Sequence, residues 1–131
     1  MAQSLTVARI EGAGIDLLDE EDLPSWFRYP EPFLRTVGTG LTRFPPWRTL
    51  EGIYSASLME DLKKRFPARD LFPFALRTDC DDVACWERGN LDRVEVIHDF
   101  ASPGWEQEAS FETYWDWFRS AINDFAEFRS A

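Results

Sequence analysis

Histidine and cysteine are scarce in this chain of 131 residues, which contains one histidine and two cysteines. With His98 as the only histidine, a Ser-His-Asp triad or a two-histidine metal site cannot be assembled in its usual form. Cys80 and Cys85 form a CxxxxC pair without further cysteines, which is a weak metal signal. We expect two free thiols, because Cys80 falls in a turn and Cys85 in the next strand. So few cysteines favour a cytoplasmic protein over a small secreted one.

Long apolar runs and cofactor motifs are also missing. No stretch of about 18 apolar residues could span a bilayer, and the amino terminus MAQSLTVARIEGAG lacks the apolar run of a signal peptide. The sequence contains no GxGxxG, GxxxxGK[ST] or HExxH motif. We therefore expect no membrane segment, no cofactor, no metal and no catalytic residues.

Basic side chains are outnumbered, with 14 Lys and Arg against 24 Asp and Glu and a net charge of −10. This charge repels phosphate backbones and anionic membranes, so a nucleic-acid partner is not expected. It either serves solubility or steers a basic protein partner toward the chain. Apolar residues make up 44% of the chain, with 11 Phe, 6 Trp and 3 Tyr, which excludes a disordered acidic tail.

The middle of the chain predicts an antiparallel meander. The expected strands are Phe72–Leu76, Val83–Trp86 and Val94–Phe100, separated by turn formers at 79–82 and 89–90. Tight turns would pair Leu76 with Cys85, and Cys85 with Val94. The single apolar face that results comprises Phe74, Leu76, Val83, Cys85, Val94 and Val96. A slip by one residue would move all of them to the other face.

Two helices are predicted around this meander. Ser57 and Glu60 form a capping-box signature, and Leu58, Leu62 and Phe66 give the helix one apolar stripe. Its basic last turn, residues 63–65, is either solvated and matched to the helix dipole or a binding patch. A longer helix is expected after Ser110 as cap, with Phe111, Tyr114, Trp115, Phe118, Ala121, Ile122 and Phe125 on one face. This face would pack on the sheet or enter the groove of a partner.

The first third predicts less regular structure. Residues 16–24 favour a short helix that Pro24 ends, and the prolines up to Pro46 impose an irregular path with room for one strand near Gly40–Phe44. The whole pattern predicts an α+β fold: a mostly antiparallel meander packed against flanking helices, with a long aromatic-rich C-terminal helix, in one domain over residues 1–131.

A few polar residues are candidates for chemistry. Asp79, Asp81 and Asp82 could hold calcium or act as acid and base, but the midway glycine and distant glutamate of a calcium loop are missing. Aspartates that bond backbone amides in a turn are the alternative. The predicted register places His98 opposite Asp81, which would allow either a structural or a catalytic His–Asp pair. Trp105 could anchor an interface, with Glu106 and Glu108 as an acidic rim, or it could plug the edge of the core.

The segments LFPFALRTDCDDVACWE, VEVIHDFASPGWE and FETYWDWFRSAIND resemble the SMI1/KNR4 family of the SUKH superfamily. The likeness covers Leu71 to about Asp124. It is carried by the Pro-Phe-Ala of the first strand, the acidic turn, the strand that ends at Trp86, a third strand and a closing helix with the pair Trp117 and Phe118.

This resemblance implies an α+β fold and a non-enzymatic role. Many bacterial relatives are immunity proteins that bind and neutralise a polymorphic toxin, often a nuclease, whereas others are regulatory interaction modules. The acidic charge fits occlusion of a basic toxin. From their chemistry, we expect the contact residues to be Asp79, Asp81, Asp82, Trp105 and Glu106. A small acidic-site hydrolase that uses these aspartates and His98 is a further alternative.

Overall fold

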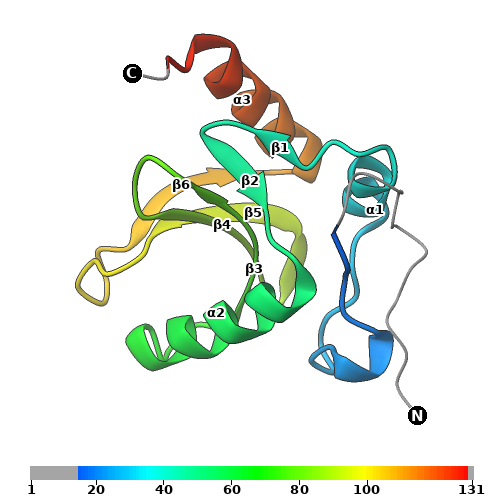
Figure 1. Cartoon of the computed structure of the whole chain (residues 1–131). Coiled ribbons are helices and arrows are strands. Elements are labelled where there is room, and N and C mark those ends of the chain that lie inside the picture. Colours follow the sequence, from blue (N-terminus) through cyan, green and yellow to red (C-terminus); the bar gives the residue numbers. More distant parts are fainter. Residues whose placement is uncertain (1–14, 130–131) are drawn as a thin grey trace.

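The computed structural model describes residues 15–129, and within this range it confirms the expected α+β class. The strands of its antiparallel sheet follow one another in chain order (Figure 1). They are β1 (Arg43–Phe44), β2 (Trp47–Thr49), β3 (Leu71–Arg77), β4 (Asp82–Glu87), β5 (Asn90–His98) and β6 (Gln107–Phe111). The helices are a 3-10 turn η1 (Glu20–Asp22), α1 (Glu31–Gly38), α2 (Gly52–Arg65) and α3 (Tyr114–Glu127). The amino-terminal stretch without a signal-peptide pattern lies outside the described residues.

Helices cover both faces of the sheet (Figure 1). Helix α2 packs on one face, where the buried residues are Leu62, Phe66, Leu71, Val83, Cys85 and Ile97. Helices α1 and α3 and the segment before α1 pack on the other face, in a larger cluster with Phe27, Phe33, Phe72, Phe74, Trp86, Val94, Tyr114 and Trp117. The sheet is therefore the middle layer of three. None of the helices in residues 15–129 has the length and apolar character to cross a membrane.

Stacked aromatic rings form the centre of the larger cluster. Trp86 is fully buried, and its ring stacks on Phe74 at 4.1 Å and on Phe27 at 5.3 Å between centroids. Trp117 meets Phe74 edge to face at 4.9 Å, which joins α3 to the sheet. Offset and edge-to-face pairs of this kind stabilise a core beyond the area they bury.

The predicted strand register is wrong, although the meander is confirmed. Leu76 pairs with Val83 instead of Cys85, and Cys85 pairs with Glu95 instead of Val94. Each of the two ladders contains an irregularity that shifts the pairing. The expected single apolar face is divided between the two sides of the sheet, because Val83 and Cys85 contact α2 whereas Val94 contacts the other layer. Strands buried on both faces carry no alternation from which a register can be read.

Helix α2 begins five residues before the predicted cap Ser57, after Glu51. Its start is fixed by Gly52, whose amide donates to the carbonyl of Asp16 at 2.8 Å. A Cβ atom at Gly52 would lie 2.6 Å from the backbone nitrogen of Leu18, so this close approach requires glycine. The predicted stripe is confirmed, since Leu62 and Phe66 are buried and Leu58 packs against them.

Helix α3 begins at Tyr114 after Thr113, whose hydroxyl accepts a hydrogen bond from the Asp116 amide at 3.0 Å. Ser110 was wrong as the cap, because it lies in β6 together with Phe111. The buried residues of the helix are Tyr114, Trp117 and Ala121, while Ile122 and Phe125 of the predicted stripe are exposed. Trp117 therefore lies at the centre of the buried face of α3.

The first third contains more regular structure than predicted. The short helix before Pro24 is present as η1, but α1 was missed because its prolines were interpreted only as breakers. Pro32 stands in the first turn of α1, where a missing amide hydrogen costs nothing. In place of one strand near Gly40–Phe44, β1 and β2 form a hairpin around residues 45–46.

Candidate functional site

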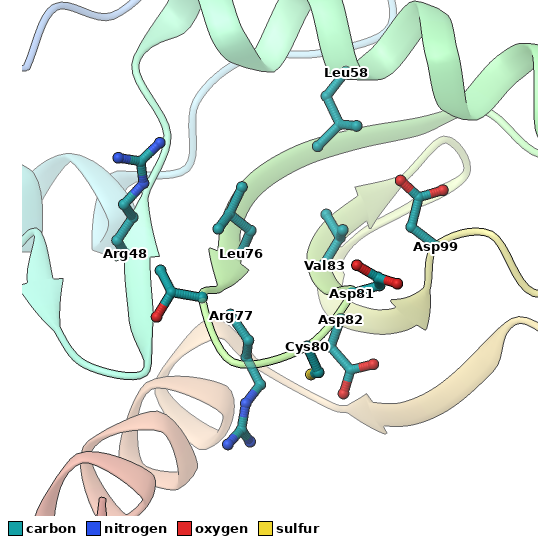
Figure 2. Close-up of a pocket in the computed structure, with 10 residues that line it drawn as sticks. Arg48, Leu58, Leu76, Arg77, Cys80, Asp81, Asp82, Val83 and Asp99 are labelled. Atoms are coloured by element: carbon teal, nitrogen blue, oxygen red, sulfur yellow. The ribbon is translucent and has the colours of Figure 1, made fainter. Parts of the chain in front are cut away.

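The acidic turn, residues 78–82, runs from the end of β3 into the first residue of β4 and holds three of the predicted contact residues, of which Figure 2 shows Asp81 and Asp82. Asp79 forms a forked ion pair with Arg77, with two N–O distances of 2.9 Å. This pair lowers the pKa of Asp79, because the hydrogen bonds from Arg77 favour the carboxylate over the acid. Asp81 is exposed, and its side chain makes no hydrogen bond or ion pair within residues 15–129. The aspartates therefore have three different environments and do not converge on one point.

Asp82 is paired with His98, the only histidine of the chain. The imidazole Nδ1 lies 2.9 Å from Oδ1 of Asp82, across the ladder between β4 and β5. The sequence predicted a His–Asp pair with Asp81, and the observed register moves the partner by one residue. The hydrogen bond to Asp82 raises the pKa of His98, and the charges of Asp81 and Glu108 raise it further. A raised pKa favours the imidazolium, which is the form that cannot act as a general base.

The loop of residues 99–106 between β5 and β6, called the β5–β6 loop below, exposes two aromatic side chains. Trp105 is 81% exposed and Phe100 is 68% exposed. The Trp105 amide donates to the Ser102 carbonyl at 2.9 Å, which closes a turn with Gly104 at φ +95°. Glycine is the residue that adopts this conformation without strain. The interpretation of Trp105 as a plug at the edge of the core is excluded by its exposure.

An ion pair with α2 fixes the start of this loop. Asp99 is buried, and its carboxylate accepts hydrogen bonds from Nε and Nη2 of Arg65 at 2.6 and 2.8 Å. The same carboxylate accepts from the Phe100 amide at 2.9 Å. The Arg65 guanidinium also stacks over the Phe100 ring at 4.2 Å from its centroid. Arg65 belongs to the last turn predicted to be either solvated or a binding patch, and the structure shows it as the residue that positions Phe100.

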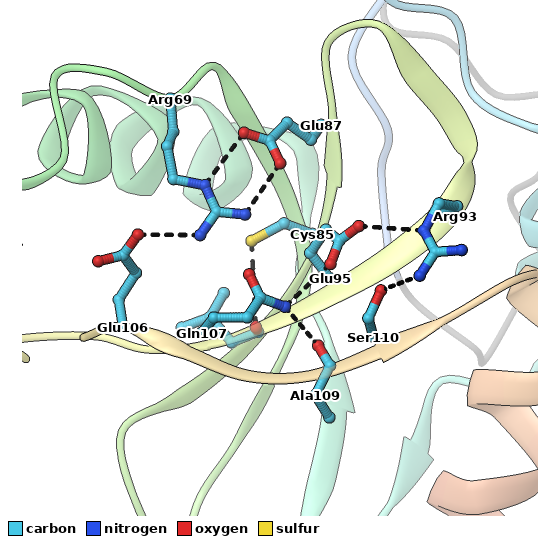
Figure 3. Close-up of polar contacts among 10 residues, drawn as sticks. Arg69, Cys85, Glu87, Arg93, Glu95, Glu106, Gln107, Ala109 and Ser110 are labelled. Carbon is cyan, nitrogen blue, oxygen red and sulfur yellow. Dashed lines mark hydrogen bonds and ion pairs between the residues drawn. The ribbon is translucent and has the colours of Figure 1, made fainter. Parts of the chain in front are cut away.

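A second ion pair fixes the end of the loop (Figure 3). Nε and Nη2 of Arg69 donate hydrogen bonds to the two carboxylate oxygens of Glu87 at 3.0 and 2.8 Å. The third guanidinium nitrogen, Nη1, donates to the Glu106 carboxylate at 3.0 Å. Glu106 also accepts from the Gly104 amide at 2.7 Å. Burial alone would raise the pKa of Glu106, but hydrogen bonds from its own amide, Arg69 and Gly104 outweigh burial and lower it.

Glu106 does not contribute the acidic rim that the sequence predicted beside Trp105. Its exposure is 7%, and it is a buried anchor whose carboxylate is occupied by Arg69 and Gly104. Glu108, two residues later in β6, is exposed and remains part of the acidic rim. The rim of the loop therefore consists of Glu108 and, on the neighbouring turn, Asp81.

The acidic turn and the β5–β6 loop adjoin. The Asp99 amide donates to the Asp81 carbonyl at 2.9 Å, which extends the pairing of β4 and β5 into both segments. Together these segments form what we call the aromatic–acidic surface: Phe100, Trp105, Asp81, Asp82 and Glu108. Sequence reasoning found Trp105 and the aspartates but missed Phe100, which it assigned to a strand. The fixing arginines gave no local signal, because their partners lie 34 and 37 residues away.

The described residues show no arrangement for metal binding. Within residues 15–129, no three or more His, Cys, Asp and Glu side chains gather as a metal site would require. Cys80 is exposed in the acidic turn and Cys85 is buried in β4, and both are free thiols. A comparison of the chain with protein-family models, with curated proteins and with solved structures found no match.

Proposed function

We propose that this protein is a non-enzymatic protein-binding domain that engages its partner through the aromatic–acidic surface. The observation that carries the proposal is Trp105, a large apolar side chain left in solvent on a loop that ion pairs fix at both ends. A loop whose backbone is fixed in this way loses little conformational freedom on binding, and Trp is enriched among the residues that dominate binding energy.

The charge around the loop favours a basic partner. Asp81 and Glu108 are exposed beside it, and the whole chain carries a net charge of −10. An acidic surface of this kind accelerates encounter with a basic protein and discriminates against acidic ones. With the resemblance to the SMI1/KNR4 family, this supports the finer proposal of a cytoplasmic bacterial immunity protein that occludes the active surface of a cognate toxin, such as a basic nuclease.

The experiment starts from the gene next to that of this protein. We expect it to encode a basic toxin domain whose toxicity in cells is suppressed by co-expression of this chain. Trp105→Ala should weaken binding by about 2 kcal/mol or more, which is about thirtyfold in Kd measured by calorimetry. Phe125→Ala is the matched control, because Phe125 is an exposed aromatic residue on α3, away from the loop.

Two outcomes would contradict the proposal at different levels. Equal loss of binding in Trp105→Ala and Phe125→Ala would contradict the assigned surface. Tight binding of a partner unrelated to toxins, still dependent on Trp105, would contradict the immunity role and support a regulatory interaction module instead.

A small hydrolase is the second candidate, and the 2.9 Å contact of His98 with Asp82 is the observation that favours it. If this pair were catalytic, His98→Ala would abolish a measurable hydrolysis while leaving the fold and partner binding intact. If the pair is structural, the His98→Ala variant and the unchanged protein show no difference in hydrolysis.

A further inference from the structure

A pocket of about 420 Å³ lies on the face of the sheet that α2 covers (Figure 2). Its floor follows from the register: Arg48 pairs with Leu76 across β2 and β3, and Leu76 pairs with Val83 across β3 and β4. Directly paired residues share a face, so these three side chains form a row. Leu58 of α2 lines the opposite wall. The pocket volume lies within the range usual for small-molecule sites.

Most charges at the pocket are already neutralised by partners. Arg77 pairs with Asp79 and Asp124, and Figure 2 shows its guanidinium extending away from Asp81. The remaining pairs are Asp99 with Arg65 and Asp82 with His98. Among the lining residues, Arg48 and Asp81 are the charged side chains without an ion pair or a hydrogen bond to any residue of the described range 15–129.

Arg48 carries the stronger sign of a missing ligand. Its Nε is buried and has no hydrogen-bond acceptor among residues 15–129. Buried N–H donors are satisfied in the great majority of cases, so an unsatisfied one next to an open pocket requires an explanation. Because Nε itself is closed to solvent, a carboxylate from outside would accept from the two terminal nitrogens of Arg48, in the forked geometry that arginine favours.

The two charges lie at opposite ends of an apolar floor. Arg48 and Val83 are two strand spacings apart, about 10 Å, and Asp81 lies two residues before Val83 in the chain. Figure 2 shows Arg48 on one side of Leu76 and Asp81 on the other. A matching ligand has a negative group, a short apolar middle and a positive group.

We propose that this pocket binds a short peptide with free ends, or a small zwitterion of the same layout. Its carboxylate accepts from Arg48, an apolar side chain contacts Leu58, Leu76 and Val83, and its ammonium group faces Asp81. The pocket shares Asp81 and Asp82 with the aromatic–acidic surface, but neither Trp105 nor Phe100 lines it, so Trp105→Ala and Arg48→Gln test the two sites separately. A net-neutral ligand also avoids the repulsion that the charge of −10 imposes on anions.

The tripeptide Gly-Leu-Gly is the probe, titrated into the full chain and followed by ¹H–¹⁵N NMR. We expect shifts at the amides of Leu58, Leu76 and Val83 that saturate at millimolar concentration. Acetylating the amino end or amidating the carboxyl end should each weaken binding by about tenfold, because each removes one of the two charges.

Charge-removing variants assign each end of the probe. Arg48→Gln should weaken binding of Gly-Leu-Gly about tenfold. In this variant, the carboxyl-amidated peptide should bind as well as the unmodified peptide. Asp81→Asn should abolish the penalty for acetylation instead. Arg43→Gln is the matched control, because Arg43 pairs with Arg48 on the neighbouring strand but does not line the pocket. Absence of saturable shifts at the pocket, or equal effects of Arg48→Gln and Arg43→Gln, would overturn the proposal.

Discussion

Arg69 and Glu106 form an ion pair at 3.0 Å, and Glu106 directly follows Trp105, the most exposed tryptophan of the described residues. Both side chains are largely buried, and Arg69 also forks onto Glu87. The pair therefore ties the end of the β5–β6 loop to the start of β3 and to β4. Its position explains how Trp105 stays in solvent while the backbone beside it is fixed: the residue after Trp105 has its side chain in the protein interior.

Glu106→Ala is expected to destabilise the fold by about 3 kcal/mol, because it leaves the buried side of Arg69 without one of its carboxylates and removes the acceptor of the Gly104 amide. Urea unfolding measures the change in free energy. Glu108→Ala is the matched control, because Glu108 is exposed on the same strand, and it should change stability by less than about 0.5 kcal/mol. Equal small effects of both substitutions would show that the pair does not fix the loop.

Arg65→Lys is expected to cost about 2 kcal/mol, although the charge is kept, because an ammonium group cannot make the forked contact with Asp99 or stack its face on Phe100. The amide resonances of residues 99–101 should broaden or shift in the same variant. Lys64→Ala, at the exposed neighbouring position, is the control and should leave both stability and these resonances unchanged. A wild-type spectrum for Arg65→Lys would show that the start of the loop is held by other contacts.

The sequence predicted the order of elements in the second half of the chain better than their register. Apolar runs between acidic and glycine-containing turns were enough to predict three successive antiparallel strands. The register failed because β3 is buried on both faces over residues 71–75, so every position is apolar and the pattern has no alternation. Strand β6 was missed for the opposite reason: residues 107–111 are largely exposed and resemble a helix start.

The candidate site was predictable only where it depends on local chemistry. Trp105 stands out in its proline and glycine turn, and the aspartates stand out as a cluster. The arginines that fix the loop act across distances of more than 30 residues, so no short motif marks them. The same reason explains why Glu106 was interpreted as a surface carboxylate: only the fold brings Arg69 to it.

The two cysteines should differ sharply in reactivity. Cys80 is exposed in the acidic turn, whereas Cys85 is fully buried in β4, where burial strongly raises the pKa of its thiol. A thiol reagent such as iodoacetamide should modify Cys80 alone in the folded protein and both cysteines in urea, as counted by mass spectrometry. Burial and the neighbouring carboxylates also raise the pKa of Cys80, so its rate should increase as the pH rises above neutrality. Rapid modification of Cys85 in the native state would contradict the burial of β4.

The His98–Asp82 pair should make stability depend on pH through one identifiable group. Because the pKa of folded His98 is raised above its ordinary value of about 6.5, the pair stabilises the fold fully below that value. This contribution is lost as the pH rises through the folded pKa.

NMR titration of the imidazole should therefore give a lower pKa for His98 in Asp82→Asn, and smaller decreases in Asp81→Asn and Glu108→Gln, whose charges face the ring less directly. His98→Gln should flatten the pH dependence of stability in this window. Added salt should weaken the effect, since the ring is 43% exposed. An unchanged pKa in Asp82→Asn would show that the 2.9 Å contact does not govern the charge of His98.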